Sequence, residues 1–193
     1  MKMKKYLKLI LMTTVIAAMC FAFAACGESD DEDSGEDEYH YLVEDMATGT
    51  EIGSFVSSDL DGNEVTEAVF AEKDVTVLNV WATYCDPCKE EMPELAAWDE
   101  ELPDNVQIIG AVIDVDEGNS DMIETAKAIC KDTGVKYTNF VYTDSVDKML
   151  IDVEAVPTTF ILDKEGKTVC TPVIGNDVEA YKAAVQEYLD QLE

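Results

Sequence analysis

The sequence predicts an α/β protein with a central mixed sheet flanked by helices and an N-terminal β-hairpin extension. Two nearly continuous apolar stretches, 75–81 and 106–115, are typical of parallel strands buried on both faces. Each is followed by a segment with apolar residues at helical spacing, and the chain ends in a strand–turn–strand pattern and a helix, 177–192. This order predicts a parallel core that an antiparallel hairpin and a last helix complete.

The region before the first buried strand predicts a short hairpin. Phe55 and Val56 precede the Asp61-Gly62 pair, and Val65 follows it. An Asp-Gly dipeptide between apolar residues favours a tight turn that joins two antiparallel strands.

The elements after the second buried strand also follow from local signals. Ser120 is expected to cap a helix that runs to about Asp132, with Gly134 as its stop signal. The remaining expected elements are a short strand over 140–142, a short helix over 145–151, a strand over 158–162, a turn over 163–166 and a strand over 167–173.

Two cysteines, Cys85 and Cys88, lie between strand 75–81 and the helix that follows it. A helix start offers unpaired backbone N–H groups and the positive end of the helix dipole, and both stabilise a thiolate. Cys85 is therefore expected to be an exposed nucleophile. Cys88 lies within disulfide reach of it, so the pair can cycle between dithiol and disulfide without a cofactor. Pro87 suits the first helical turn because its φ is preset.

A zinc half-site and a permanent structural disulfide are the alternative interpretations of this pair. A zinc site needs four ligands, and the single histidine, His40, lies in a polar segment with no cysteine near it. No metal site is therefore expected.

Residues 81–95, WATYCDPCKEEMPEL, resemble the active-site segment of the thioredoxin superfamily, and most of all that of its extracytoplasmic TlpA/ResA-like thiol-disulfide oxidoreductases. The matching positions are Trp81, Cys85, Pro87, Cys88, Glu91 and Pro93. Tyr84 stands where the family usually has a second tryptophan. Residues 156–160 resemble the cis-proline segment of the family, and Gly175 precedes the last helix as it does there. The resemblance covers about residues 50–193 and implies a thioredoxin-like fold.

The resemblance implies that Cys85 and Cys88 form a redox-active disulfide. It also implies that Glu91, one helical turn beyond Cys88, takes part in the proton transfers of the pair. A solvated surface charge is the alternative for Glu91. Asn79 stands where many thioredoxins keep a buried aspartate, which leaves Glu91 as the nearest substitute.

Pro157 is the fourth residue to which the resemblance assigns a role. A cis bond between Val156 and Pro157 would leave the Val156 backbone available to pair with an extended substrate peptide. An ordinary trans proline at the start of a strand is the alternative.

Residues 1–25 predict an export signal, because lysines precede an apolar run over 9–25. The sequence Phe-Ala-Ala-Cys that ends at Cys26 resembles a bacterial lipobox, so Cys26 is expected to receive lipid and become the mature N-terminus. An uncleaved membrane helix is the alternative, since the run is close to the shortest length that spans a bilayer.

Residues 27–38 are acidic and contain no apolar side chain, which predicts a disordered spacer. A calcium loop is the alternative, but the Gly and terminal Glu of an EF-hand are missing. The expected organisation is a signal peptide over 1–25, a lipid-attached acidic linker over 26–50 and a thioredoxin-like domain over 51–193.

The charge of the chain excludes some classes of partner. It has 13 Lys and Arg residues against 42 Asp and Glu residues, and its net charge is −29. Removal of the signal peptide makes the chain more acidic still. Such a protein is not expected to bind nucleic acid or anionic lipid headgroups by charge.

The predicted function is a thiol-disulfide oxidoreductase, lipid-anchored on the extracytoplasmic face of the cell membrane, that reduces disulfides of exported proteins. The resemblance allows a part in cytochrome c maturation, and it alone implies a membrane thiol carrier as the electron donor. Asp86, Glu90 and Glu91 lie close to the pair, and negative charge disfavours a thiolate. The pair is therefore expected to be a reductant, with a potential near about −270 mV or somewhat higher.

A thiol peroxidase and a non-catalytic binding lipoprotein on the same fold are the alternative functions. A peroxidase of this fold needs Thr or Ser where this chain has Ala82, and an arginine beside its cysteine, whereas the chain has no arginine. The intact cysteine motif argues against a purely binding role.

Cys130 and Cys170 are left over after these assignments. Their even number outside the cytoplasm permits a second disulfide, and burial as separate thiols is equally common in such apolar contexts.

Overall fold

The computed structural model describes residues 48–150 and 153–192. The expected signal peptide, Cys26 and nearly all of the acidic linker lie outside the described residues. Within the described part of the chain, no helix is long and apolar enough to cross a membrane.

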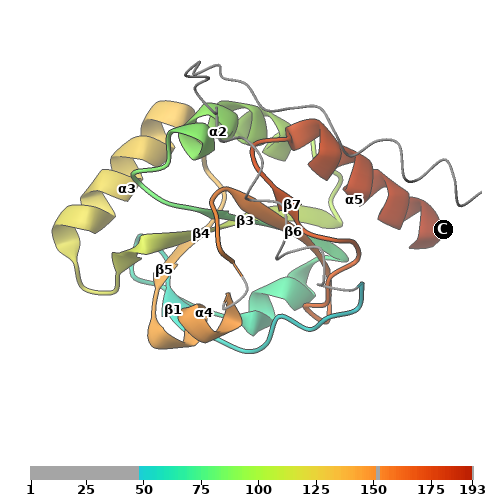
Figure 1. Cartoon of the computed structure of the whole chain (residues 1–193), viewed down its shortest axis with the longest axis horizontal. Coiled ribbons are helices and arrows are strands. Elements are labelled where there is room, and N and C mark those ends of the chain that lie inside the picture. Colours follow the sequence, from blue (N-terminus) through green and yellow to red (C-terminus); the bar gives the residue numbers. More distant parts are fainter. Residues whose placement is uncertain (1–47, 151–152, 193) are drawn as a thin grey trace, which may run out of the picture. The chain divides into compact units, whose positions relative to one another are not determined.

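A five-stranded mixed sheet forms the centre of the domain, in the order β5-β4-β3-β6-β7 (Figure 1). The strands are β3 (Val75–Trp81), β4 (Val106–Asp116), β5 (Asn139–Tyr142), β6 (Thr158–Asp163) and β7 (Val173–Ile174). β3 pairs in parallel with β4 and antiparallel with β6. β4 and β5 are parallel, and β6 and β7 are antiparallel. The predicted fold, a parallel core with an antiparallel addition, is confirmed.

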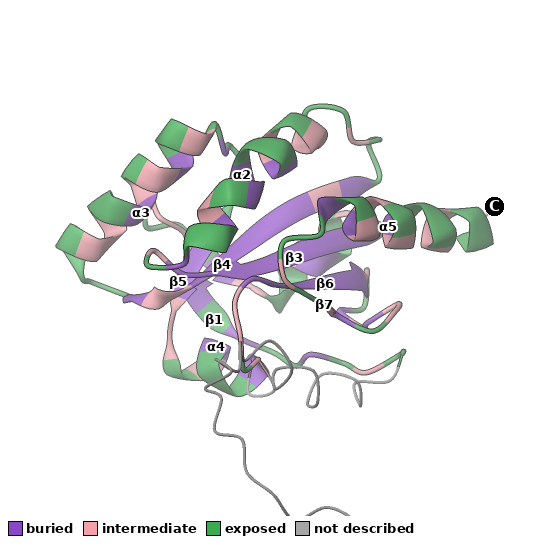
Figure 2. Cartoon of the chain, turned by 45° about the horizontal axis from the view of Figure 1, so that its top comes forward, coloured by how far each residue is buried: buried purple, intermediate pink, exposed green. Residues whose placement is uncertain are grey.

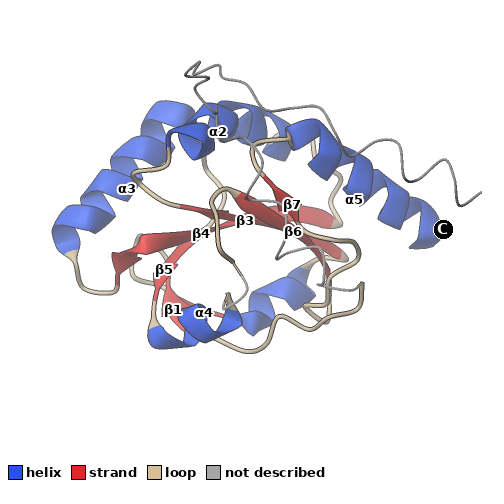
Figure 3. Cartoon of the chain, viewed as in Figure 1, coloured by secondary structure: helices blue, strands red, loops and turns tan. Residues whose placement is uncertain are grey.

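Helices cover both faces of this sheet (Figure 3). On one face lie α2 (Asp86–Asp99), α3 (Ser120–Thr133) and α5 (Val178–Leu192), and on the other lie the 3-10 helix η2 (Glu67–Glu72), α4 (Asp144–Met149) and the hairpin. Every residue of β3 is buried as a consequence (Figure 2). Because successive side chains of a strand point to opposite faces, Val77 joins the core beneath α2 and Leu78 joins the core on the hairpin side.

The predicted hairpin is confirmed as β1 (Val56–Ser58) and β2 (Glu64–Thr66), which pair antiparallel in a sheet of their own. Gly62 takes a φ of 88° in the turn, a conformation that favours glycine. The Phe55 ring stacks on the Phe140 ring of β5 with centroids 4.7 Å apart, which attaches the hairpin to the domain.

Two boundary predictions are wrong. The cap of α3 is Asn119, not Ser120, because the Asn119 side chain accepts a hydrogen bond from the Met122 N–H. The last strand does not extend over 167–173: Lys167 and Thr168 make single bridges, and β7 contains only Val173 and Ile174. Pro172 lies between Thr168 and Val173. Because proline has no backbone N–H to donate to the neighbouring strand, it gives a physical reason for the interruption. The Gly134 stop signal is confirmed, with a φ of 82°.

Candidate active site at the start of helix α2

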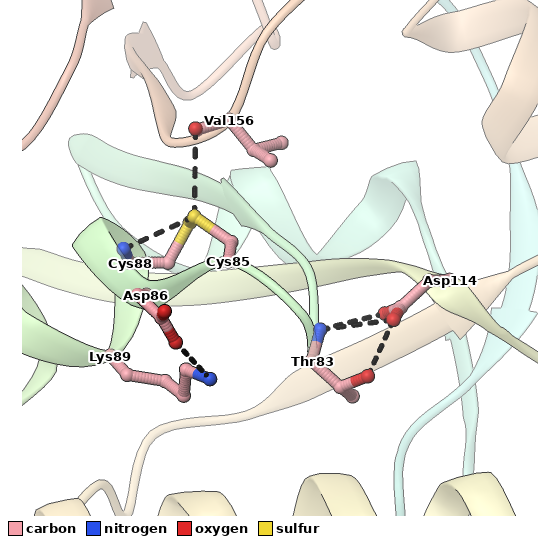
Figure 4. Close-up of polar contacts among 7 residues, drawn as sticks. All are labelled: Thr83, Cys85, Asp86, Cys88, Lys89, Asp114 and Val156. Atoms are coloured by element: carbon pink, nitrogen blue, oxygen red, sulfur yellow. Dashed lines mark hydrogen bonds and ion pairs between the residues drawn. A yellow bond between two sulfur atoms is a disulfide. The ribbon is translucent and has the colours of Figure 1, made fainter.

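The cysteine pair lies where the central strand β3 passes into α2, as predicted. Cys85 is the N-cap of α2, and its Sγ accepts a hydrogen bond from the Cys88 N–H at 3.1 Å (Figure 4). Cys85 and Cys88 are joined by a disulfide with their Cα atoms 5.3 Å apart. The helix start therefore supplies a donor to the sulfur that would become the thiolate on reduction.

Cys85 is much less exposed than the sequence predicts. Its exposed fraction is 5%, and Cys88 is completely buried, whereas the neighbouring Tyr84 is 70% exposed. The Val156 carbonyl oxygen, from a segment far away in the sequence, lies 3.5 Å from Cys85 Sγ (Figure 4). The prediction of an exposed sulfur is wrong because local sequence does not report this covering segment.

The covering segment contains the predicted cis proline. The Val156–Pro157 peptide bond is cis, which confirms the conformation that the resemblance implies. Pro157 is buried, and its carbonyl oxygen accepts a hydrogen bond of 2.8 Å from the Gly175 N–H. β6 begins directly after it, so the central sheet holds this turn against the cysteine pair.

Glu91 is a buried acid and not a surface charge. It lies one helical turn beyond Cys88 on the buried face of α2, and its exposed fraction is 4%. Its Oε1 accepts a hydrogen bond from Asn79 Nδ2 at 2.7 Å, and its Oε2 accepts one from the Tyr181 hydroxyl at 2.9 Å. Burial raises the pKa of Glu91 to about 7 in spite of these two donors. A carboxyl with this pKa exchanges protons near neutral pH.

Asn79 connects Glu91 to the strand after the cis proline. Its Nδ2 also donates to Thr159 Oγ1 at 3.0 Å, and Thr159 lies two residues after Pro157. The structure thus places Asn79, Glu91 and the Pro157 strand in one buried group.

The charge beside Cys85 is weaker than the sequence suggests. Asp86 pairs with Lys89 Nζ at 2.7 Å, and this side-chain hydrogen bond and the lysine charge lower the pKa of Asp86 (Figure 4). Because the lysine offsets the aspartate, the charge argument for a reductant rests mainly on Glu91. The sequence analysis missed this pair, although an (i, i+3) spacing on a helix is a local signal for it.

Asp114 is a second residue that the sequence analysis missed. It lies near the carboxyl end of β4, and its carboxylate accepts hydrogen bonds from the Thr83 N–H at 2.9 and 3.1 Å and from the Thr83 hydroxyl (Figure 4). These bonds hold the loop that carries Cys85. An acid near the carboxyl end of the strand beside β3 was the available signal, because loops meet at that edge of a parallel sheet.

Tyr181 is the third missed residue. It is completely buried on α5 and donates to Glu91 from 90 residues further along the chain. No local pattern distinguishes it from an ordinary aromatic residue on the apolar face of an amphipathic helix.

Cys130 and Cys170 are separate free thiols, which decides between the two alternatives for them. Burial raises the pKa of Cys130 to about 11, so it stays protonated at neutral pH. Cys130 also lines a cavity of about 490 Å³ beside α3, and none of Cys85, Cys88, Glu91 and Pro157 contributes to its wall. Across the described residues, no group of three or more His, Cys, Asp or Glu side chains could hold a metal ion.

Comparison with known proteins places these features in a family. A model of the AhpC/TSA family matches residues 48–169. The thiol-disulfide oxidoreductase ResA of Bacillus thuringiensis subsp. konkukian (strain 97-27) is 30% identical over 160 residues, which cover 80% of this chain and 83% of that protein. ResA of Bacillus subtilis (strain 168) is 31% identical over 127 residues, or 65% of this chain and 67% of that protein.

Solved structures agree with this fold. The thioredoxin domain of a thiol-disulfide oxidoreductase from Bacteroides vulgatus superposes with a TM-score of 0.60 at 24% identity, over 74% of this chain and 97% of that one. StoA from Bacillus subtilis superposes with a TM-score of 0.53 at 20% identity, over 69% of this chain and 96% of that one.

Proposed function

Because the chain belongs to the AhpC/TSA family of thioredoxin-like proteins and is a thiol-disulfide oxidoreductase of the ResA type, we propose that Cys85 and Cys88 reduce disulfides of exported proteins. The observation that carries the proposal is the disulfide at the start of α2, with Cys85 Sγ accepting the Cys88 N–H and facing the cis-proline turn. Thioredoxin-like chemistry needs a sulfur in that position and a peptide backbone beside it.

The reaction proceeds by two exchange steps. In the reduced protein, the Cys85 thiolate attacks one sulfur of the substrate disulfide, and the other substrate sulfur leaves as a thiolate and takes up a proton. Cys88 then gives its proton to ionised Glu91 and attacks Cys85 Sγ, which releases the second substrate sulfur. Two electrons have moved to the substrate, and the protein holds the Cys85–Cys88 disulfide.

Glu91 and Pro157 support these steps in different ways. Glu91 lies one turn from Cys88, and its raised pKa suits a group that accepts a proton near neutral pH. Pro157 turns the chain so that the backbone of Val156 lies beside the sulfur, where an extended substrate peptide could align. A membrane thiol carrier would return the electrons, and apocytochrome c is one substrate that the family resemblance allows.

The midpoint potential of the Cys85–Cys88 pair tests the direction of electron flow. Equilibration of the full chain with a thiol buffer is expected to give a potential near about −270 mV, as for thioredoxin. Cys85→Ala should abolish the signal, and Cys170→Ser is the matched control that should leave it unchanged. A potential near about −120 mV would mean that the protein donates disulfides. Substrates can then be trapped with Cys88→Ala, which leaves the mixed disulfide on Cys85.

The proposed location on the extracytoplasmic face of the membrane depends on Cys26. We expect the full chain to incorporate a labelled fatty acid and Cys26→Ser to lose the label, because Cys26 would carry the lipid. Cys20→Ser, within the same apolar run, is the control that should keep the label. A full chain that takes up no label yet stays in the membrane fraction would be held there by an uncleaved helix over residues 9–25.

A further inference from the structure

The Tyr181 hydroxyl lies between two acceptors behind the cysteine pair. It is within hydrogen-bond distance of Glu91 Oε2, at 2.9 Å, and of the Gly175 carbonyl oxygen. A phenol has one proton and can donate to only one acceptor at a time. The position of that proton must therefore depend on whether Glu91 is ionised.

Both protonation states of Glu91 are fully bonded in this arrangement. When Glu91 is ionised, Tyr181 donates to Oε2 while Asn79 donates to Oε1. When Glu91 is protonated, its own hydroxyl can donate to the Tyr181 oxygen, and Tyr181 can turn its proton to the Gly175 carbonyl. Rotation of one hydroxyl exchanges the two states, and no heavy atom has to move.

The same contacts join α2 to the cis-proline segment. Gly175, which accepts from Tyr181, donates its own N–H to the Pro157 carbonyl at 2.8 Å. Glu91 is one helical turn from Cys88 on the buried face of α2. Tyr181, from the last helix, thus bridges the acid next to the cysteine pair and the turn that covers Cys85.

We propose that Tyr181 is a positioning residue for the disulfide exchange: its hydroxyl orients the Glu91 carboxyl and lets it take up a proton beside Cys88 without losing its hydrogen bonds. This inference rests on the proposed role of Glu91 as the proton acceptor of Cys88. Tyr181 itself touches neither cysteine in this scheme and acts only through Glu91.

The groups around Glu91 define what the loss of this hydroxyl should do. Burial raises the pKa of Glu91, donation from Asn79 and Tyr181 lowers it, and the charge of Glu94 raises it. Glu94 is paired with Lys182 at 2.8 Å on the surface. Burial, with a smaller contribution from the charge of Glu91, raises the pKa of Tyr137 well above its usual value, so Tyr137 stays neutral. Removal of the Tyr181 donor therefore raises the pKa of Glu91 further.

The test compares Tyr181→Phe with Tyr188→Phe in the full chain. Tyr188 lies on the same helix and its pKa responds to other acids, so it is the matched control. The Glu91 carboxyl is titrated by infrared or carbon NMR spectroscopy in the oxidised protein, and the Glu91→Gln variant identifies its signal. Tyr181→Phe should tighten proton binding by about tenfold, a pKa increase of about one unit, and Tyr188→Phe should change nothing.

A kinetic measurement connects the titration to the reaction. The mixed disulfide of Cys85 with thionitrobenzoate is formed, and the release of the coloured thiol by Cys88 is followed against pH. The midpoint of this profile should move upward by the same amount in Tyr181→Phe, because the step needs ionised Glu91. Unfolding curves of both variants are compared with that of the wild type. They check that the phenylalanine ring keeps the packing of the helix when the hydroxyl is removed.

The outcomes separate this inference from the proposed function. An unchanged Glu91 titration in folded Tyr181→Phe, or a shifted titration with an unchanged release profile, overturns the inference while disulfide reduction by the wild type still stands. Failure of the wild type to reduce any protein disulfide overturns the proposed function. If Tyr181→Phe does not fold, uniform replacement of tyrosine by the more acidic 3-fluorotyrosine tests the same hydroxyl: it should lower the pKa of Glu91, and no change would contradict the inference.

Discussion

Glu91 shows how one buried side chain can set the pH behaviour of this enzyme. A carboxyl that is 4% exposed is costly to ionise, and the two donors that face it only partly offset that cost. Its pKa of about 7 therefore comes mainly from its burial. The same raised pKa also affects the stability of the fold.

Glu91→Gln should change the pH dependence of stability. The pKa of Glu91 is about 7 in the folded protein, against an ordinary value of 4.5 in the unfolded chain, so the folded state binds more protons between these two pH values. Its stabilising effect is complete below about pH 4.5 and is lost as the pH rises through 7. Relative to wild type, the variant should therefore gain about 2–3 kcal/mol in free energy of unfolding between pH 5 and pH 8.

Urea unfolding of the oxidised proteins at several pH values measures this difference. Glu90→Gln is the control, since Glu90 is exposed beside Glu91 on the same helix. If stability depends on pH in the same way in wild type and Glu91→Gln, the pKa of Glu91 is the same in the folded and unfolded states and the prediction is wrong.

Asp114→Ala should weaken the loop that carries Cys85. The change removes the acceptor of the Thr83 N–H and hydroxyl, and hydrogen bonds to a charged acceptor are among the stronger ones. We expect a loss of about 1–3 kcal/mol in urea unfolding of the oxidised protein, with faster amide exchange at Thr83. Asp116→Ala, at an exposed position two residues on, should have little effect. Equal effects of the two variants would argue against the role of Asp114.

At the scale of elements, the backbone of strand β4 lies close to a side chain of the neighbouring strand β5. Gly110 faces Asn139, whose Oδ1 accepts a hydrogen bond of 2.8 Å from Trp81 Nε1. A Cβ atom at position 110 would lie 1.8 Å from Asn139 Oδ1 and 3.1 Å from Trp81 Nε1. The contact of β3, β4 and β5 beneath the active site therefore needs glycine at this position.

Gly110→Ala should destabilise the protein by about 2–4 kcal/mol, because it displaces Asn139 and leaves the buried Trp81 N–H without its acceptor. Thermal or urea unfolding measures the loss. Asn139→Ala removes the side chain that the new methyl group strikes, so the double variant should be less destabilised than the sum of the single ones. If the losses of the two single variants simply add in the double variant, the methyl group at position 110 does not act through the Asn139 side chain.

At the scale of the whole molecule, charge is the dominant feature. A net charge of −29 on 193 residues implies strong self-repulsion in the folded state. The ion pairs that the structure describes, such as Lys127–Asp61 at 3.1 Å and Lys136–Glu100 at 2.6 Å, are exposed and stabilise little. Salt weakens both the repulsion among the acidic residues and the attraction within the ion pairs. The weaker repulsion should have the larger effect on the free energy of unfolding.

Salt should consequently stabilise the full chain. The screening length falls from about 30 Å at 0.01 M ionic strength to about 8 Å at 0.15 M. We expect the melting temperature to rise by about 5 °C over this range of sodium chloride, measured by calorimetry. Lys127→Ala should keep the same salt response, since an exposed pair contributes little. A melting temperature that falls with salt would show that ion pairs dominate.

Several features of this protein were determined by local sequence. The Asp61-Gly62 dipeptide specified the hairpin turn, the apolar run specified β3, and Gly134 specified the end of α3, because turn chemistry and hydrophobic period act over a few residues. The motif around Cys85 placed the disulfide at a helix start for the same reason. Boundaries such as the Asn119 cap and the short β7 were missed, since neighbouring residues can serve equally well until packing selects one.

Only the tertiary structure decided the chemistry around the cysteines. Val156 covers Cys85 from 71 positions further along the chain, and Tyr181 contacts Glu91 from 90 positions further along. The burial of Glu91 depends on the packing of such distant segments. The sequence alone determined which two cysteines form the disulfide and which elements hold them. Exposure and proton affinity depend on what packs against a side chain, and that is settled only when distant parts of the chain meet.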